Sequence, residues 1–428
     1  MENRNSLIGK RIRDLRLKLN LTQSELADNS FTKSFISQVE KGLTTPSIKS
    51  LAIIAERLGV PVSYFLSDEA LSHHDGTEQY LIHLETARRL HTEKRFVDAV
   101  RQYKATLSHV PPTYHDLIAG VHLALAEIYS DQSRFHDAMN EVETAIEHLK
   151  LSKNNFTLAR AYNILGHLQT ELKDFVGACS SFRAGISALN SDHPGDISLL
   201  VRLLVNLGIS YSHSQEFHRS IETLARAVEL MRETDEFYNF GKACHTLGYA
   251  YAKLGDYENA IAYTTRALEL YLAIGHVDLA MNARINLAIF LRLAGNHEEA
   301  HRHLRFTLEE CKSDGLRARA HAELAHLAVA EGDYDEAIEN VKRAFELSPA
   351  HAEIPEWLEI LVRVGEARPL PREWVDQLAQ HISRWRADDR ALAEAHSSLG
   401  ALYRLLGDTE KANHHLSQSV ALFKKAQG

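Results

Sequence analysis

A repeated spacing of small residues constrains this chain more than any other feature of its sequence. The spacing is clearest at residues 247–267, where Gly248 is followed by Ala260 after twelve positions and by Ala267 after seven more. Small side chains at these offsets let two antiparallel helices approach closely, and Gly255 suits the turn between them. The spacing returns along most of the chain, which predicts an array of helical hairpins.

Seven further segments carry the spacing, and the first small residue of each is called here the aligned small residue. Besides Gly248, the aligned small residues are Ala87, Ala126, Gly166, Gly208, Ala288, Ala325 and Gly400. Twelve positions after them stand Ala99, Ala138, Ala178, Ser220, Ala300, Ala337 and Ala412. Most steps are near 40 residues, but the last is 75, so we expect one degenerate hairpin at 351–388 and nine hairpins in all.

This pattern resembles the tetratricopeptide repeat, and Pro349 occupies the terminal proline position of its repeat. The resemblance implies an α-solenoid over residues 80–428, in which stacked hairpins form a right-handed superhelix. The first helix of each hairpin would line the concave surface. The expected inner positions lie six, three and two residues before the aligned small residue and one after it.

The inner positions are rich in amides and cations over four consecutive repeats and the start of a fifth. The candidate peptide-binding residues are Arg160, Asn163, Arg202, Asn206, Lys242, His245, Asn282, Asn286 and Arg319. An asparagine side chain can bond a peptide N–H and C=O together, and Arg or Lys can hold a carboxylate. An extended peptide therefore suits this surface, although inner faces of such arrays are also polar simply because they are solvated.

The first 66 residues do not follow the repeat and predict a bundle of five short helices. Apolar spacing and capping signals place these helices at 6–19, 23–28, 33–41, 48–59 and 62–66. Thr22 and Glu25 form the sequence signature of a capping box, and Thr32 caps the third helix. Gly42 suits a left-handed cap at the end of that helix. Two short helices joined by a tight turn indicate a helix-turn-helix.

The segment LTQSELA…TKSFISQVEKG resembles the xenobiotic-response-element class of bacterial regulators, and the likeness covers residues 7–66. It implies that Gln23 contacts a DNA phosphate and that Arg16 and Glu40 form a partly buried ion pair. It also implies dimers on dyad-symmetric operators, with half-sites about one helical turn apart. The side chains placed toward the major groove are Thr32, Lys33, Ser34, Ser37 and Gln38. Lys33 and Gln38 are the best equipped to read base edges.

Two plainer interpretations stand beside these assignments. Lys33 and Gln38 would otherwise be ordinary solvated helix surface, and Arg16 and Glu40 two unrelated surface charges. The polar stretch 67–79 is interpreted as a linker between head and array. Its adjacent histidines resemble a metal pair only superficially, because no further ligands stand near them.

Composition agrees with a helical, cytoplasmic protein. The chain has 428 residues with only nine prolines and 21 glycines, and its net charge is −9. Residues 1–70 carry a charge of +2 and the rest −11, which fits a nucleic-acid-binding head on an acidic body. Three widely separated cysteines indicate a reducing compartment. No apolar run has the length of a signal peptide or a membrane span.

No catalytic motif or metal-ligand set was found in the sequence. We therefore expect neither an enzyme nor a cofactor. The cysteines, at 179, 244 and 311, are expected to be small core residues.

The combination of head and array resembles the peptide-sensing regulators of Gram-positive bacteria, the group named for Rap, Rgg, NprR, PlcR and PrgX. The resemblance implies dimerisation through the array and capture of a short signalling peptide by asparagines, a role that Asn163, Asn206 and Asn286 match. His245 stands where an amide is expected. Peptide binding would then shift the operator-binding equilibrium. The alternative is a scaffold whose array sequesters a response regulator or another protein. A third possibility, assistance to dephosphorylation of a partner, has only fold analogy behind it.

Overall fold

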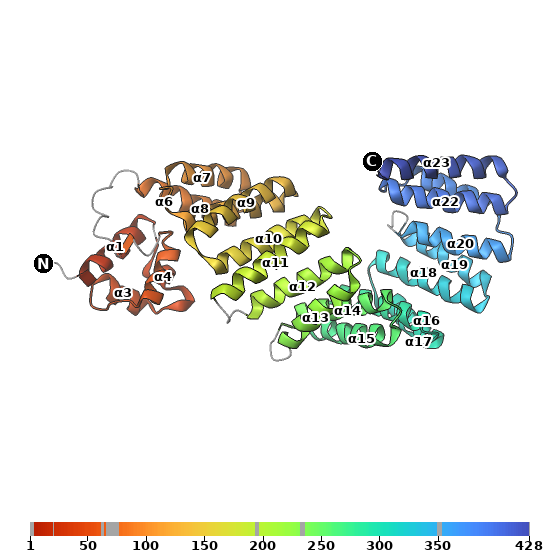
Figure 1. Cartoon of the computed structure of the whole chain (residues 1–428), viewed down its shortest axis with the longest axis horizontal. Helices are drawn as coiled ribbons and strands as arrows, with labels where there is room; N and C mark the ends of the chain where they lie inside the picture. The colour runs from red at the N-terminus through yellow and green to blue at the C-terminus, as the bar shows by residue number, and fades with distance from the viewer. Residues whose placement is uncertain are drawn as a thin grey trace. The chain divides into compact units, whose positions relative to one another are not determined.

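The computed structural model describes residues 4–19, 21–60, 64–65, 77–192, 197–231, 236–348 and 353–427. This described part is all-α, with 22 α-helices, one short 3-10 helix and no strand (Figure 1). The chain divides into two compact units, residues 1–210 and 211–428.

The head contains the helices that the sequence predicts at 6–19, 23–28, 33–41 and 48–59. They are α1 (Arg4–Lys18), α2 (Gln23–Ala27), the 3-10 helix η1 (Asp28–Ser30), α3 (Lys33–Glu40) and α4 (Ile48–Arg57). The capping box is confirmed, since Thr22 Oγ1 accepts from the Glu25 backbone N–H at 3.2 Å and Glu25 Oε2 from that of Thr22. Gly42 has the expected positive φ of 69°. Of the predicted fifth helix, only residues 64–65 lie within the described part.

The core of the head continues into the first helices of the array. Ile12, Ile36 and Ile54 are fully buried in it, and the same cluster includes Tyr80 and Ile118 from the array. The head and the start of the array therefore share one hydrophobic core. Residues 66–76, which make up most of the predicted linker, lie outside the described part.

Seven array helices begin in the first unit. They are α6 (Thr77–Thr92), α7 (Phe96–His109), α8 (His115–Asp131), α9 (Phe135–Ser152), α10 (Asn155–Glu171), α11 (Phe175–Asp192) and α12 (Ile197–His213). The helix α6 includes the last three residues of the predicted linker, 77–79. Each odd-numbered helix up to α11 packs against the preceding one as the second helix of a hairpin.

Eleven helices follow in the second unit. They are α13 (Phe217–Met231), α14 (Phe237–Lys253), α15 (Tyr257–Ala273), α16 (Val277–Leu293), α17 (His297–Glu310), α18 (Asp314–Glu331), α19 (Tyr334–Leu347), α20 (Ile354–Ala367), α21 (Arg372–Arg384), α22 (Asp389–Leu405) and α23 (Thr409–Gln427). The 18 helices from α6 onward match the nine predicted hairpins in number and order.

Close helix packing at the aligned small residues is confirmed at Gly248. A Cβ atom added there would lie 2.1 Å from Thr264 Oγ1 on α15 and 3.0 Å from the Ala260 carbonyl oxygen. Gly255, in the turn between α14 and α15, has a φ of 81°. No larger residue could occupy position 248 without moving α15. The three cysteines are buried, as predicted.

The degenerate hairpin has an aligned small residue of its own, which the sequence spacing did not reveal. The aligned residue is the twelfth residue of its helix in α8, α10, α12, α14, α16, α18 and α22. Gly365 is the twelfth residue of α20. The helix therefore follows the array's register, although Gln377 stands twelve positions later in place of a small residue.

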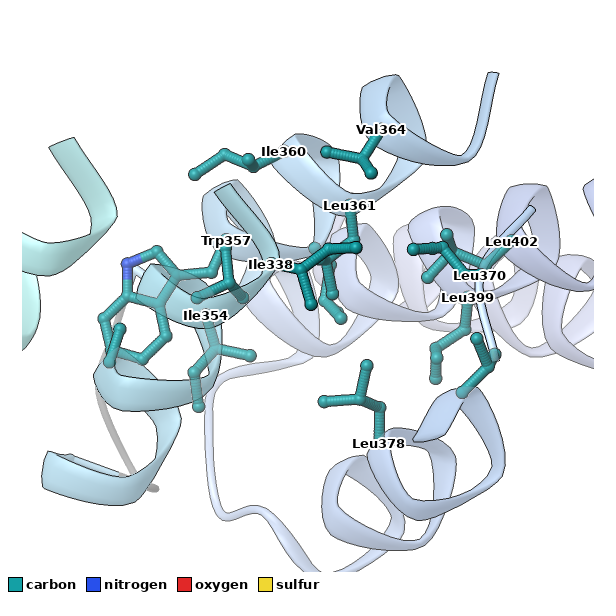
Figure 2. Close-up of a cluster of buried hydrophobic side chains, with 14 of the residues drawn as sticks. Ile338, Ile354, Trp357, Ile360, Leu361, Val364, Leu370, Leu378, Leu399 and Leu402 are labelled. Atoms are coloured by element: carbon teal, nitrogen blue, oxygen red, sulfur yellow. The ribbon is translucent and has the colours of Figure 1, made fainter. Parts of the chain in front are cut away.

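The buried face of α20 joins one large apolar cluster. Figure 2 shows Trp357, Leu361 and Val364 of α20 gathered with Leu378 of α21 and Leu399 of α22. All five are at most 4% exposed. This packing fixes the rotation of α20 about its axis, and so determines which of its residues remain accessible.

Candidate functional site

The predicted recognition helix α3 presents its polar face to solvent. Lys33, Ser34 and Gln38 are exposed, whereas Ile36 and Val39 are buried at 0% and 1%. The helix is therefore held by its apolar side and leaves the polar side accessible.

Thr32, Ser37 and Gln38 differ in their exposure and local contacts. Thr32 is exposed, and its Oγ1 accepts from the Phe35 backbone N–H at 3.1 Å, so it caps the helix. Ser37 is half-buried. Gln38 Oε1 accepts from the Thr44 hydroxyl at 3.2 Å, which limits the rotation of the Gln38 side chain.

Glu40, the last residue of α3, connects the recognition helix to α1 and α2 through its side chain. Its Oε2 accepts from Arg16 Nη2 at 2.9 Å, and its Oε1 lies 2.5 Å from Arg16 Nε, so the predicted ion pair between α1 and α3 is confirmed. Both side chains are less than 10% exposed. The hydrogen bonds to Glu40 raise the pKa of Arg16. Gln23 donates to Glu40 Oε2 at 2.7 Å, so the residue predicted to contact phosphate is held against this pair.

In the first unit, the inner positions bring two predicted amides together. Asn206 Nδ2 on α12 donates to Asn163 Oδ1 on α10 at 3.0 Å. Arg160 and Arg202 are exposed and make no hydrogen bond or ion pair with the described residues. The amides thus bond to each other across neighbouring helices, while the two guanidinium groups remain available.

In the second unit, four predicted residues form a continuous network across three first helices. Asn286 Nδ2 on α16 lies 2.6 Å from His245 Nε2 on α14, and Asn286 Oδ1 accepts from Arg319 Nη2 at 3.3 Å. Arg319 on α18 also donates to Asn282 Oδ1. Its Nε lies 2.9 Å from Glu353 Oε1, just before α20. Both ends of the Asn286 amide are therefore occupied.

Burial sets the charge states in this network. Desolvation, assisted by the charge of Arg319, lowers the pKa of His245 to about 4. His245 is therefore neutral near pH 7, and its Nε2 accepts the hydrogen bond from Asn286. Burial also lowers the pKa of Lys242, whose ammonium lies 5.8 Å from the centre of the Tyr238 ring.

An open pocket of about 230 Å³ lies between α20 and α22. Its lining consists of Glu359, Val362, Arg363, Ser397, Ser398 and Ala401. None of these residues was among the predicted ligand contacts. With Gly365 as the aligned small residue of α20, however, all six occupy inner positions of the repeat. The missing register of the degenerate hairpin concealed the three residues on α20, whereas the three on α22 belong to the recognised repeat of Gly400.

Neither a cluster of metal ligands nor a membrane-spanning helix is present among the described residues. No group of three or more His, Cys, Asp or Glu side chains in the described ranges is arranged to hold a metal ion. No helix within those ranges is both long and apolar enough to cross a membrane.

Three family models match parts of the chain. A helix-turn-helix model matches residues 12–65, and two tetratricopeptide repeat models match residues 240–309 and 318–351. An immunity repressor protein of Bacillus phage phi105 is 32% identical over 65 residues, which are 15% of this chain and 45% of the repressor. The chain thus matches about half the length of that relative.

Two solved structures are similar to large parts of the chain. The apo form of RapI matches with a TM-score of 0.55 and 16% identity, over 80% of this chain and 97% of RapI. PlcR of Bacillus thuringiensis, in complex with the peptide PapR7 and DNA, matches with a TM-score of 0.39 and 16% identity, over 65% of this chain and 99% of PlcR. The RapI likeness shows a shared helical-repeat fold. The chain therefore carries a helix-turn-helix of the xenobiotic-response-element type at its N-terminus and tetratricopeptide repeats in its C-terminal part.

Proposed function

We propose that this protein is a sequence-specific DNA-binding transcriptional regulator whose array binds a short signalling peptide and thereby changes operator binding. The observation that carries the DNA-binding part is the exposed polar face of α3, set on the buried pair of Arg16 and Glu40. A recognition helix needs this combination, because base readout requires accessible side chains on a rigidly held helix.

The contacts divide into readout and positioning. Lys33 and Gln38 read base edges, because a lysine suits guanine acceptors and a glutamine amide suits adenine. Thr32, Ser34 and Ser37 supply hydroxyls to bases or phosphates. One N–H of the Gln23 amide donates to Glu40, and the second N–H contacts a phosphate at the first turn of α2, where helix N–H groups favour an anion. The protein binds a dyad operator as a homodimer.

Coupling between ligand and DNA is supported by the shared core of head and array. Tyr80 on α6 is 0% exposed and Ile118 on α8 is 6% exposed, and both pack in the same cluster as the head helices. A head packed in this way follows any rearrangement of the first hairpins. The peptide shifts the equilibrium only by its difference in affinity for the two forms of the protein.

The DNA-binding claim is tested by selecting operators from a random duplex library with the full-length protein and then measuring affinities. Lys33→Ala and Gln38→Ala are each expected to weaken binding to the selected sequence by about 1–3 kcal/mol and to relax the preference at one base position. Lys150→Ala is the matched control, since Lys150 is an exposed lysine on α9, which is an array helix outside the head. The proposal would be contradicted if the protein selected no preferred sequence, or if Lys150→Ala weakened binding as much as Lys33→Ala and Gln38→Ala do.

The scaffold alternative predicts a different result. A scaffold would bind a protein such as a response regulator, and no peptide would change its operator affinity. Measuring operator affinity with the full chain, in the presence of synthetic peptides and of candidate response regulators in turn, separates the two.

A further inference from the structure

The pocket between α20 and α22 differs from the hydrogen-bonded network of the second unit in the state of its polar groups. In that network, Asn286 and Arg319 already bond to neighbouring side chains. In the pocket, Arg363 and Glu359 are exposed and make no hydrogen bond or ion pair with the described residues. The pocket therefore offers its charged groups to a ligand without first breaking an internal contact.

The pocket is also built on a rigid base. Arg363 and Glu359 stand one helical turn apart on α20, so they lie on the same face of the helix. The adjoining face of α20, with Leu361 and Val364 fully buried, anchors the helix in the core shown in Figure 2. The two charges are thus presented by an element that cannot rotate freely.

The surrounding charges give the pocket two distinct ends. The pKa of His326, on α18, is lowered to about 4, first by burial and then by the charges of Arg292 and Arg363. Arg363 therefore lies near α18, at the positively charged end of the pocket. Desolvation raises the pKa of Glu356, and the carboxylates of Glu353, Glu323 and Glu359 raise it further. Glu353 and Glu323 are paired with Arg319 and Arg292, so among these three carboxylates Glu359 is the one that has no cationic partner among the described residues. A ligand that carries an anionic group beside an N–H donor matches both ends.

We propose that this pocket binds the terminal α-carboxylate of a ligand, with Arg363 pairing with the carboxylate and Glu359 accepting the adjacent N–H. Arginine suits a carboxylate because its planar fork donates two parallel hydrogen bonds. The Ser397 hydroxyl, on the facing helix, can donate a further bond. The ligand chemistry occurs both at the C-terminus of a peptide and in a free amino acid. The inference rests on the proposed ligand-sensing function of the array.

The test is affinity selection with the full-length protein and mass spectrometry of the retained peptides. The probes are two random heptapeptide mixtures, identical except that one has free C-terminal carboxylates and the other C-terminal amides. Free-carboxylate peptides should be enriched about tenfold or more over their amides, because the pair with Arg363 is charge-assisted. Arg363→Met should abolish this preference, and Arg363→Lys should restore it only in part.

Arg305→Met provides the matched control, because Arg305 is an exposed arginine on α17, the second helix of its hairpin. Glu359→Gln is expected to lower peptide retention while keeping the preference for the free carboxylate. Thermal melts of all variants verify folding. Each of the twenty free amino acids is assayed in parallel by the shift in melting temperature that it causes.

The outcomes separate this inference from the proposed function. If the free-carboxylate and amide peptides are retained equally, and Arg363→Met retains them as well as the unaltered protein does, the pocket assignment is overturned and peptide sensing stands. If only a free amino acid stabilises the protein, and Arg363→Met removes that effect, the carboxylate site stands and peptide sensing is overturned. If neither probe binds, both are overturned.

Discussion

At the level of single residues, Glu40 links the first helix of the head to the recognition helix. It accepts hydrogen bonds from Arg16 and Gln23, and Arg16 also donates to the Leu21 carbonyl at 2.8 Å. Replacing Glu40 by Ala would leave the Arg16 charge buried without its partner. We expect this change to lower the free energy of unfolding by about 3–5 kcal/mol.

The measurement for Glu40→Ala is hydrogen exchange of the α1 and α3 amides in the full chain, which should accelerate. Glu56→Ala, at an exposed glutamate of α4, is the control and should leave the exchange unchanged. Protection in Glu40→Ala equal to that of the unaltered protein would show that the pair does not hold α3.

His245 gives the second unit a predictable pH dependence. Its pKa is lowered to about 4 in the folded protein, against about 6.5 in the unfolded chain. Because the unfolded chain binds the proton more readily, the contribution of His245 to stability is present above pH 6.5 and is lost as the pH falls toward 4. The loss at pH 5 should be about 2 kcal/mol.

Urea denaturation of the protein and of His245→Gln at pH 7.5 and pH 5 measures this contribution. Other buried histidines, such as His326 and His415, add to the total pH dependence, so the informative quantity is the difference between the two proteins. The variant should lose less stability on acidification. Identical losses would mean that His245 is not the neutral, buried group described above.

Local features of single residues could be predicted from the sequence, but their long-range hydrogen bonds could not. The caps at Thr22 and Thr32 and the turn at Gly42 were predictable, because their signals lie within a few residues of the sites that they stabilise. The pairing of Asn286 with His245 was not, since it joins side chains 41 positions apart. Repeat spacing places such residues on one face but does not determine whether they bond to each other or to a ligand.

At the level of helices, the array depends on close contact at its aligned small residues. Gly248→Ala would place a methyl group 2.1 Å from Thr264 Oγ1, so we expect a loss of about 1–3 kcal/mol in the free energy of unfolding. The combination with Thr264→Ala should cost less than the sum of the two single changes, because the hydroxyl that clashes is gone.

Gly120→Ala is a suitable control for this cycle, since Gly120 lies within α8 and a Cβ there would meet nothing within 4 Å. That substitution should stabilise the protein by about 0.5–1 kcal/mol through helix propensity. Chemical denaturation of the four variants measures all of these values. Strict additivity in the cycle would contradict the packing described at Gly248.

The eighth hairpin is the one repeat that the spacing of small residues did not resolve. In the eighth hairpin, Gly365 keeps the register of the first helix, but the residues after it, EARPLP, replace the usual turn. Gln377 replaces the second small residue, so α21 cannot pack on α20 as closely as in the other repeats. The sequence pattern needs a small residue in both helices of a hairpin. Because α21 lacks its small residue, the pattern did not identify Gly365 or the inner residues of α20.

At the level of the whole molecule, the shared core of head and array is the feature most relevant to signalling. The polar sequence of the predicted linker suggested a tether, but the burial of Tyr80 and Ile118 with the head helices was not visible in it. Tertiary contacts of this kind depend on where α6 and α8 come to lie. They place the head in direct contact with the array.

Substitution of Tyr80 tests this contact. The Tyr80 hydroxyl is buried and has no hydrogen-bond partner among the described residues, so Tyr80→Phe should leave stability nearly unchanged. Tyr80→Ala should remove about 3–5 kcal/mol and reduce any effect of ligand on operator affinity. Denaturation and operator titration of both variants provide the check. Unaltered ligand response in Tyr80→Ala would show that the signal does not pass through this core.

The proposed function requires ligand binding in the array to be coupled to operator binding by the head. Linkage requires the two effects to be equal: the factor by which ligand changes operator affinity is the factor by which operator changes ligand affinity. The direct measurement is therefore calorimetric titration of the full-length protein with a peptide obtained from the selection, with and without saturating operator duplex. We predict a change in peptide Kd of about 5- to 150-fold that matches the change in operator Kd. Tight binding of both ligands with no change in either Kd would contradict it.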